Sequence, residues 1–213
     1  MSCLEKAEHN QKPTFTDHMR VWFKWAIEPL AAFFNRIGLT PNAMTLLGLS
    51  GNFAGAYFVL RGEMTLGGLF MLVSTPFDAL DGAMARLRGE ANDWGAFVDS
   101  VTDRYGELAI LGALLYYFSS SGDSLSSVVT FAAAAGTILV SYVKARAEAV
   151  GFEAKVGLLS RVERYLVLAP ALALNQPRLA IWILAVFANY TALQRIFHVR
   201  TQARARLKQA KGE

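Results

Sequence analysis

The sequence has few charged residues and only one cysteine. Asp, Glu, Lys and Arg make up 18% of its 213 residues, below the roughly 25% that is usual in soluble domains. Hydrophobic residues make up 54%. The single cysteine, Cys3, excludes an intrachain disulfide. Such a composition leaves an apolar soluble enzyme or an integral membrane protein, and the length of the apolar runs decides between them.

Apolar runs of membrane-spanning length recur along the chain. A bilayer-spanning helix needs about 20 mostly apolar residues. We predict six spans, the fifth of them short, at 43–60, 65–86, 95–118, 126–146, 162–175 and 178–200. The connections are short, and we see no internal repeat or low-complexity tract. The sequence therefore predicts an all-α integral membrane protein, with a six-helix membrane domain over 41–213 that ends in a basic tail.

Basic residues are almost missing from one set of connections. With six spans, both termini lie on one side and the connections after spans one, three and five lie on the other. Of the 21 Lys and Arg residues, only Arg61 and Arg178 fall in those three connections or at their edges. Because the positive-inside rule places basic connections in the cytoplasm, we predict a multi-pass protein of the cell membrane with both termini cytoplasmic. We expect no cleavable signal peptide, since the first 20 residues are polar.

The stretch 14–37, TFTDHMRVWFKWAIEPLAAFFNRI, mixes basic and aromatic residues. This suits an amphipathic helix that lies in the membrane interface; the alternative is a helix packed on a soluble domain. We predict that residues 1–40 form a cytoplasmic, interfacial segment. The net charge of +4 and the tail RTQARARLKQAKGE favour an anionic leaflet as partner. Nothing else in the chain favours nucleic acid.

Four aspartates interrupt the apolar runs. Asp78 and Asp81 are three residues apart, and Asp99 and Asp103 are four apart, so each pair shares one helix face. The two predicted helices are consecutive and joined by a short turn, so we expect them to pack antiparallel with the pairs facing each other. Carboxylates gathered in a low-dielectric site need positive charge nearby. Mg²⁺ bound by carboxylates and substrate phosphates would supply it.

A single aspartate within the membrane could be a partnered polar residue, but four at these spacings indicate a functional site. Gly82 and Gly95 leave room for a ligand beside the backbone, and Arg86 is placed to meet a phosphate. A carboxylate-lined ion or metal transporter is one alternative. It would need a polar path through the bilayer, whereas the acids lie near one end of the spans. This favours a site that is open to one side only.

Together these residues form a motif: Asp78-x-x-Asp81-Gly82-x-x-Ala85-Arg86, then eight residues, then Gly95-x-x-x-Asp99-x-x-x-Asp103. The motif resembles the complete signature of the CDP-alcohol phosphotransferase family. That resemblance implies six transmembrane helices, an N-terminal juxtamembrane helix and a homodimer. It also implies that the hydroxyl of a small alcohol attacks the β-phosphorus of a CDP-linked lipid and that CMP leaves.

The resemblance also implies roles for single residues. Asp78, Asp81, Asp99 and Asp103 would hold two Mg²⁺ ions, with Mn²⁺ as the alternative, and Asp103 would also be the catalytic base. The residues implied in CDP-lipid binding are Thr40, Pro41, Asn42, Gly82, Ala85, Arg86 and Gly95. The first three belong to the segment GLTPNAMT, which opens the first span.

Two further segments, SYVKARAEAVGF at 141–152 and LLSRVERYLV at 158–167, resemble the phosphatidylinositol-phosphate synthases of this family. The resemblance implies inositol 1-phosphate as acceptor, its phosphate held by basic side chains. The residues implied are Lys144, Arg161, Arg164 and Arg195. Val162 and Ser160 replace a proline and a glutamate that are common in those enzymes. Glycerol 3-phosphate therefore remains an alternative acceptor.

Overall fold

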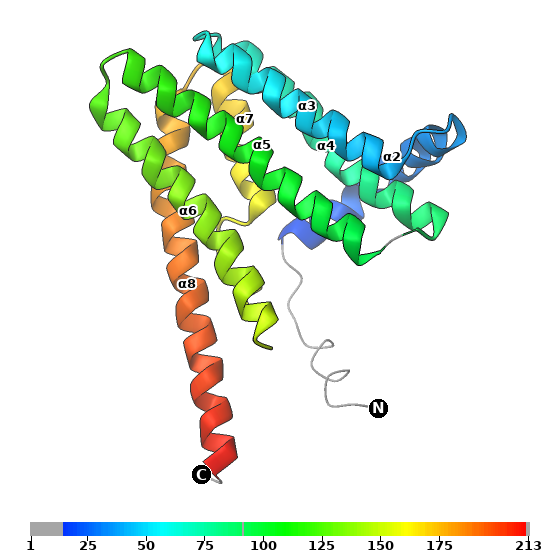
Figure 1. The fold of residues 1–213 in the computed structure, drawn as a ribbon, viewed down its shortest axis with the longest axis vertical. Coiled ribbons are helices and arrows are strands. Elements are labelled where there is room, and N and C mark those ends of the chain that lie inside the picture. Colours follow the sequence, from blue (N-terminus) through cyan, green and yellow to red (C-terminus); the bar gives the residue numbers. More distant parts are fainter. Residues whose placement is uncertain (1–14, 91, 212–213) are drawn as a thin grey trace.

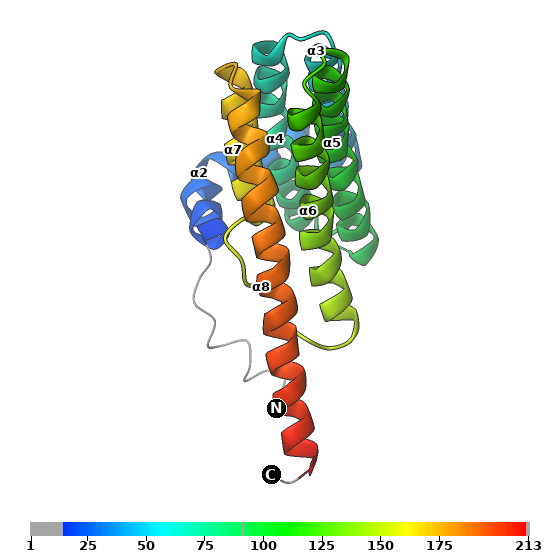
Figure 2. The same cartoon turned by 90° about the vertical axis from the view of Figure 1, so that its left-hand side faces the viewer.

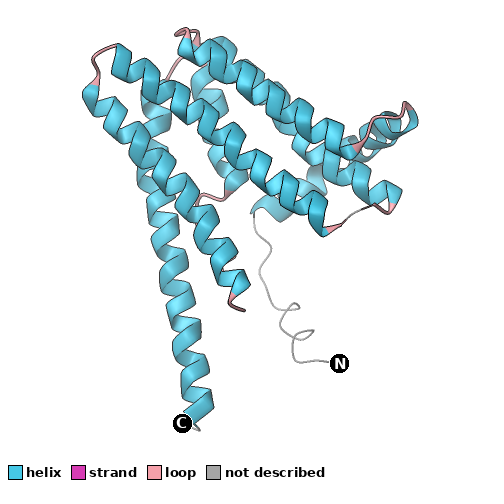
Figure 3. Cartoon of the chain, in the orientation of Figure 1, coloured by secondary structure: helices cyan, strands magenta, loops and turns pink. Residues whose placement is uncertain are grey.

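The computed structural model describes residues 15–90 and 92–211, which form seven α-helices and no strand (Figure 3). The helices are α2 (Phe15–Arg36), α3 (Pro41–Leu60), α4 (Met64–Arg88), α5 (Asp93–Ser120), α6 (Ser124–Ala149), α7 (Arg161–Ala173) and α8 (Pro177–Lys211). The predicted all-α fold is confirmed.

Three of the described helices, α3, α6 and α8, are both long and apolar enough to cross a membrane. Helices α4 and α5 have 25 and 28 residues, enough to span a hydrocarbon core of about 30 Å at a rise of about 1.5 Å per residue, but both carry the aspartates. Helix α7 has only 13 residues. The count of six spans therefore stays a prediction.

Helix α2 covers most of the predicted amphipathic stretch. Its Ala31 is fully buried in a small apolar cluster with Leu80 and Met84 of α4. Trp25 and Phe33, by contrast, are 79% and 57% exposed. One side of α2 thus packs on the bundle while large apolar side chains face outward. This is compatible with an interfacial helix, which stays a prediction.

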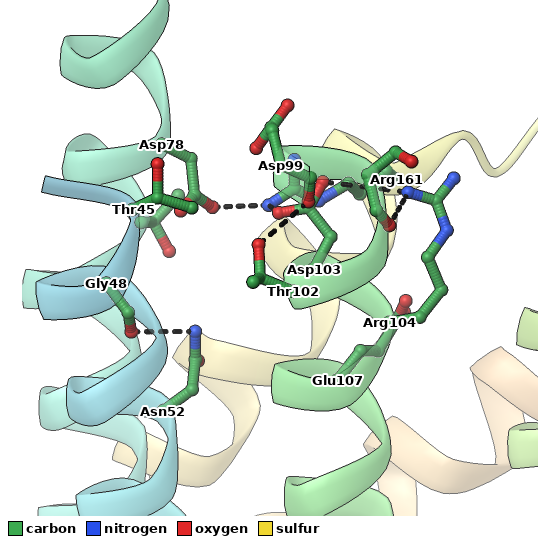
Figure 4. Close-up of polar contacts among 12 residues, drawn as sticks. Thr45, Gly48, Asn52, Asp78, Asp99, Thr102, Asp103, Arg104, Glu107 and Arg161 are labelled. Atoms are coloured by element: carbon green, nitrogen blue, oxygen red, sulfur yellow. Dashed lines mark hydrogen bonds and ion pairs between the residues drawn. The ribbon is translucent and has the colours of Figure 1, made fainter. Parts of the chain in front are cut away.

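Helix α3 lies between the two aspartate-bearing helices and packs against both (Figure 1). Among the described residues, α4 and α5 do not form a close-packed pair. The expectation that these consecutive helices pack directly on each other is therefore wrong. Their aspartates instead lie on either side of a region next to the start of α3, at Thr45, and Arg161 of α7 reaches this region (Figure 4).

Small residues bring α7 against α4. A methyl group at Gly68 would lie 2.2 Å from the backbone nitrogen of Ala173 and 2.7 Å from the carbonyl oxygen of Ala169. Only glycine permits this approach. The two helices run antiparallel, so contact at Gly68 brings the start of α7, at Arg161, beside Asp78.

Helices α6 and α8 form a second close pair. Asn189 of α8 donates hydrogen bonds to the carbonyl oxygens of Ala132 and Ala185, at 2.9 and 2.8 Å. A methyl group at Gly136 would lie 2.5 Å from the Asn189 side chain. The run AAAAGT at 132–137 thus packs inside the protomer, so it gives no support to the homodimer, which stays a prediction.

Asp123, in the connection before α6, ties that connection to the start of α8. It caps α6 by accepting hydrogen bonds from the backbone and hydroxyl of Ser126, and it pairs with Arg178 at 2.9 Å. The backbone N–H of Ser126, followed by its hydroxyl, holds the pKa of the Asp123 carboxyl below its ordinary value.

Candidate active site

The four aspartates lie near one end of α4 and α5, close to the turn that joins them. Helix α4 ends at Arg88 and is capped by Gly89, which adopts a left-handed φ of 67°. Helix α5 begins after Asn92, whose side chain accepts a hydrogen bond from the backbone N–H of Gly95 at 2.8 Å. Asp81 and Asp103 are buried, and Asp78 and Asp99 are half-buried. The ends of the two helices thus place four carboxylates in one region.

A guanidinium from α7 reaches these carboxylates. Arg161 forms ion pairs with Asp78 of α4 and Asp103 of α5 (Figure 4). The sequence predicts an acceptor role for Arg161 and does not indicate this contact, which joins residues 83 positions apart in the case of Asp78. No local spacing could have indicated it. The chain itself therefore supplies part of the positive charge that the aspartates need.

The aspartates differ in their other partners. Thr45 of α3 donates its hydroxyl to Asp81 at 2.6 Å, a partner that sequence reasoning also missed. Arg104 lies 3.7 Å from Asp103. Oδ1 of Asp99 is buried and accepts no hydrogen bond from the described residues. An unpartnered buried carboxylate oxygen is costly, so Asp99 is the carboxylate with the greatest need for a cation.

The donor set suits a hard divalent cation, because every candidate ligand is a carboxylate oxygen and one such oxygen has no partner. As the side chains are placed, however, the described part of the chain has no three His, Cys, Asp or Glu side chains grouped to hold one ion. The Arg161 guanidinium instead takes one oxygen each of Asp78 and Asp103. The residue types therefore suit a divalent cation. For such an ion to bind, Arg161 would have to release its ion pairs with Asp78 and Asp103.

The motif glycines face open space. A methyl group at Gly82 would meet only Nη1 of Arg86, at 3.3 Å, and one at Gly95 only Oδ1 of Asn92, at 3.5 Å. Neither glycine is needed for packing, which leaves room for a ligand beside the backbone. Arg86 is exposed and Ala85 is half-buried.

The segment before α3 has a clear local role. Thr40 caps α3 by accepting a hydrogen bond from the backbone N–H of Ala43 at 3.2 Å, and Pro41 is the first helical residue. Asn42 is exposed. Arg88 of α4 donates to the carbonyl oxygen of Leu39 at 2.5 Å, so this segment is anchored to the motif end of α4.

The other predicted acceptor residues have partners of their own. Arg164 forms a bidentate pair with Glu107 at 2.6 and 2.9 Å. Arg195 donates to the carbonyl oxygens of Val140 at 2.6 Å and Val156 at 2.9 Å, and Lys144 lies 3.8 Å from Glu148. Of the four basic residues, the structure brings Arg161 into contact with the aspartates.

The pair of Glu107 and Arg164 is predicted to be a large contributor to stability. Their side chains are only 3% and 2% exposed, and removing one partner of a buried pair typically costs about 3–5 kcal/mol because the other charge is left uncompensated. We expect Glu107→Leu to lower the thermal unfolding temperature in detergent strongly. The double variant Glu107→Leu/Arg164→Met should recover most of that loss. A single variant as stable as the wild type would contradict this account.

The chain is similar to known proteins over most of its length. Residues 38–198 match the CDP-alcohol phosphatidyltransferase family. The phosphatidylinositol phosphate synthase of Streptomyces avermitilis is 35% identical over 90% of this chain and 85% of the relative. That of Mycobacterium marinum is 35% identical over 85% and 82%.

Solved structures show the same fold. The Mycobacterium tuberculosis phosphatidylinositol phosphate synthase with CDP-DAG bound superposes with a TM-score of 0.76 at 31% identity, over 81% of this chain and 92% of that one. Its complex with manganese and citrate gives a TM-score of 0.77 at 31% identity, over 82% and 89%. Since the family match spans most of the sequence, the chain belongs to the CDP-alcohol phosphatidyltransferase family.

Proposed function

We propose that this phosphotransferase moves a phosphatidyl-type group from a CDP-linked lipid to inositol 1-phosphate and releases CMP. The observation that carries the proposal is that the four motif aspartates lie at neighbouring ends of α4 and α5, where two of them, Asp78 and Asp103, pair with Arg161 of α7. The relatives named above support the acceptor. Membership of a phosphotransferase family overturns the alternative of a carboxylate-lined transporter.

The setting of the enzyme is part of the proposal. The scarcity of Lys and Arg in the connections that hold Arg61 and Arg178 supports a cell-membrane protein with both termini in the cytoplasm. A CDP-linked lipid could then reach the site sideways with its acyl chains in hydrocarbon. A homodimer follows only from the resemblance to the family.

Divalent cations are the proposed cofactors. Asp78, Asp81, Asp99 and Asp103 would hold two ions, Mg²⁺ or alternatively Mn²⁺. When bound, such ions neutralise the pyrophosphate and stabilise the departing CMP. The manganese complex of the Mycobacterium tuberculosis relative supports the use of a divalent metal.

The chain's own residues would carry the remaining steps. Arg86, exposed beside the open face of Gly82, would bind a phosphate of the donor. Asp103 would accept the proton of the attacking hydroxyl as the new bond to phosphorus forms and the bond to CMP breaks. The buried position of Asp103 would limit the access of water, which could otherwise attack the phosphorus in place of the acceptor.

The phosphate of the acceptor would be held by the four predicted basic residues. Arg161 is the best placed of them, because it already reaches the carboxylates. Arg164 and Arg195 have donors left over, since a guanidinium offers five N–H groups. Lys144 is half-exposed and can turn toward an anion.

Arg161 and a divalent cation need the same oxygens of Asp78 and Asp103. We therefore expect Arg161→Gln to bind Mn²⁺ more tightly than the wild type, by about tenfold or more, since a charge-assisted contact is worth about 1.5–3 kcal/mol. Free Mn²⁺ can be measured by electron paramagnetic resonance with purified protein in detergent.

The matched control for this prediction is Arg104→Gln. It removes the same charge beside Asp103 from a residue 3.7 Å away that does not bridge the aspartates. Its effect on Mn²⁺ affinity should be small. Equal affinities in the wild type and Arg161→Gln, or equal gains in both variants, would contradict competition for shared oxygens.

The test of the proposed function is a CMP-release assay in detergent with a CDP-linked diacylglycerol lipid and a panel of acceptors. Inositol 1-phosphate should support turnover, and free inositol should not. Glycerol 3-phosphate is the second candidate, left open because Val162 and Ser160 depart from the pattern common in the inositol-phosphate enzymes. Turnover with glycerol 3-phosphate alone would replace the first acceptor with the second. No CMP release with any phosphorylated acceptor would overturn the proposal.

A further inference from the structure

The connection between α6 and α7 contains no regular secondary structure, yet it leads directly into Arg161. Residues 151–160 form no helix, and Gly151 and Gly157 adopt positive φ values of 77° and 134°. Backbone N–H and C=O groups in such a segment need partners from elsewhere. Helix α8 supplies them.

Four side chains of α8 contact this segment in strict antiparallel order. The Thr191 hydroxyl accepts from the backbone N–H of Leu159 at 3.1 Å. Nε of Arg195 donates to the carbonyl oxygen of Val156 at 2.9 Å. Gln202 and Arg206, further along α8, contact Glu153 and Gly151 in turn.

The Gln202 contact resembles one rung of a β-ladder. Its amide donates to the carbonyl oxygen of Glu153 at 2.6 Å and accepts from the backbone N–H of the same residue at 3.1 Å. Arg206 then donates to the carbonyl oxygen of Gly151 at 2.6 Å. Its guanidinium also lies 4.2 Å from the ring centroid of Phe152, a favourable cation–π distance.

The dimensions of the two segments match. The contacting residues of α8 are spaced by four, seven and four positions, so they share one helix face. From Thr191 to Arg206 the helix rises about 22 Å at about 1.5 Å per residue. An extended chain from Gly151 to Leu159 spans at most about 26–29 Å at about 3.3–3.6 Å per residue. The segment is therefore long enough to follow α8 over this distance.

The outer part of these contacts lies beyond the bundle. Helix α8 continues well past the end of α6 and away from the other helices (Figures 1 and 2). The basic tail by itself suggested attraction to an anionic leaflet. Gln202 is uncharged, so its two hydrogen bonds to the backbone of Glu153 do not contribute to such attraction. The extension of α8 therefore has a second role.

We infer that the C-terminal part of α8 is a positioning element for the start of α7, with Gln202 and Arg206 as positioning residues. By holding 151–160 against α8, they fix where the chain enters α7 and therefore where Arg161 stands relative to Asp78 and Asp103. The catalytic consequence rests on the proposed function: acceptor binding should depend on side chains that do not touch the acceptor.

The test compares the double variant Gln202→Ala/Arg206→Ala with Arg204→Ala, both as full chains in detergent. Arg204 is an exposed basic residue of the same extension for which the structure gives no hydrogen bond or ion pair among the described residues. Its replacement removes a similar charge and leaves the contacts to 151–160 intact. Arg206→Lys serves as a second control, since it keeps the charge.

Two measurements are needed. Hydrogen exchange of the amides at 152–156 should be about tenfold faster in the double variant, because local opening loses its restraining contacts, and unchanged in Arg204→Ala. In the CMP-release assay, the KM for the phosphorylated acceptor should rise at least severalfold while the KM for the CDP-linked lipid stays the same. Arg206→Lys should fall between the wild type and the double variant.

The outcomes separate the inference from the proposed function. Unchanged exchange in the double variant would overturn the inference whatever the assay gives. Faster exchange with an unchanged acceptor KM would overturn the positioning role. Failure of the proposed function would show itself separately, as a wild-type enzyme that releases no CMP with any phosphorylated acceptor.

Discussion

Chelation of divalent cations is expected to abolish CMP release completely, and added Mg²⁺ or Mn²⁺ should restore it. The reaction brings a pyrophosphate beside four carboxylates, two of them buried. Arg161 is the one basic side chain that bridges two of them among the described residues. Arg161 and Arg104, which lies 3.7 Å from Asp103, cannot balance both the four acids and the pyrophosphate in a low-dielectric site. Activity should be followed in excess EDTA and again after each metal is added back.

A binding measurement makes this prediction independent of turnover. A cation that binds only the folded protein stabilises it by about 2.7 kcal/mol at 100 times its Kd, so Mg²⁺ should raise the thermal unfolding temperature in detergent. Asp99→Asn should lose that rise, whereas Glu90→Gln, an exposed carboxylate nearby, should keep it. Full activity in excess EDTA would contradict the metal site, as would an identical shift in Asp99→Asn.

Much of the fold followed from composition and spacing. Long apolar runs with few charges allow little besides helices, which is why the all-α class was predictable. The spacing of the aspartates is itself helical, so each pair could be placed on one face. The prediction that α4 packs directly on α5 was wrong, because a short turn constrains only the ends of the two helices that it joins. The small residues of α3, such as Gly48 and Gly51, let a third helix approach α4 closely.

The partners of the site residues could not be predicted in the same way. Arg161, Thr45 and Glu107 contact groups that are 36 to 83 positions away in sequence, and no periodicity reports such distances. Residue type showed which side chains are charged, but it did not show which group each of them contacts. A carbonyl oxygen is present at every residue, so nothing in the sequence marks the two carbonyls that Arg195 binds.

Asp103→Asn is the substitution expected to slow the reaction most. Asparagine keeps the shape of the side chain but cannot accept the proton of the attacking hydroxyl. Loss of a general base typically costs at least about 10²-fold, and we expect a fall in kcat of that size. Binding of the CDP-linked lipid, measured separately, should be partly retained. Asp93→Asn, at an exposed position in the first turn of α5, is the matched control and should turn over normally.

Measuring activity at increasing Mg²⁺ concentration distinguishes a catalytic base at Asp103 from a residue that only binds the metal. If Asp99 only holds an ion, Asp99→Asn should regain much of its activity as Mg²⁺ is raised, because mass action offsets a weaker site. Asp103→Asn should stay slow at every Mg²⁺ concentration, because no excess of metal replaces a missing proton acceptor. Recovery of Asp103→Asn at high Mg²⁺ would show that Asp103 is a ligand alone, and the base would have to be sought elsewhere. Persistent loss with a normal melting temperature would place the proton transfer at Asp103.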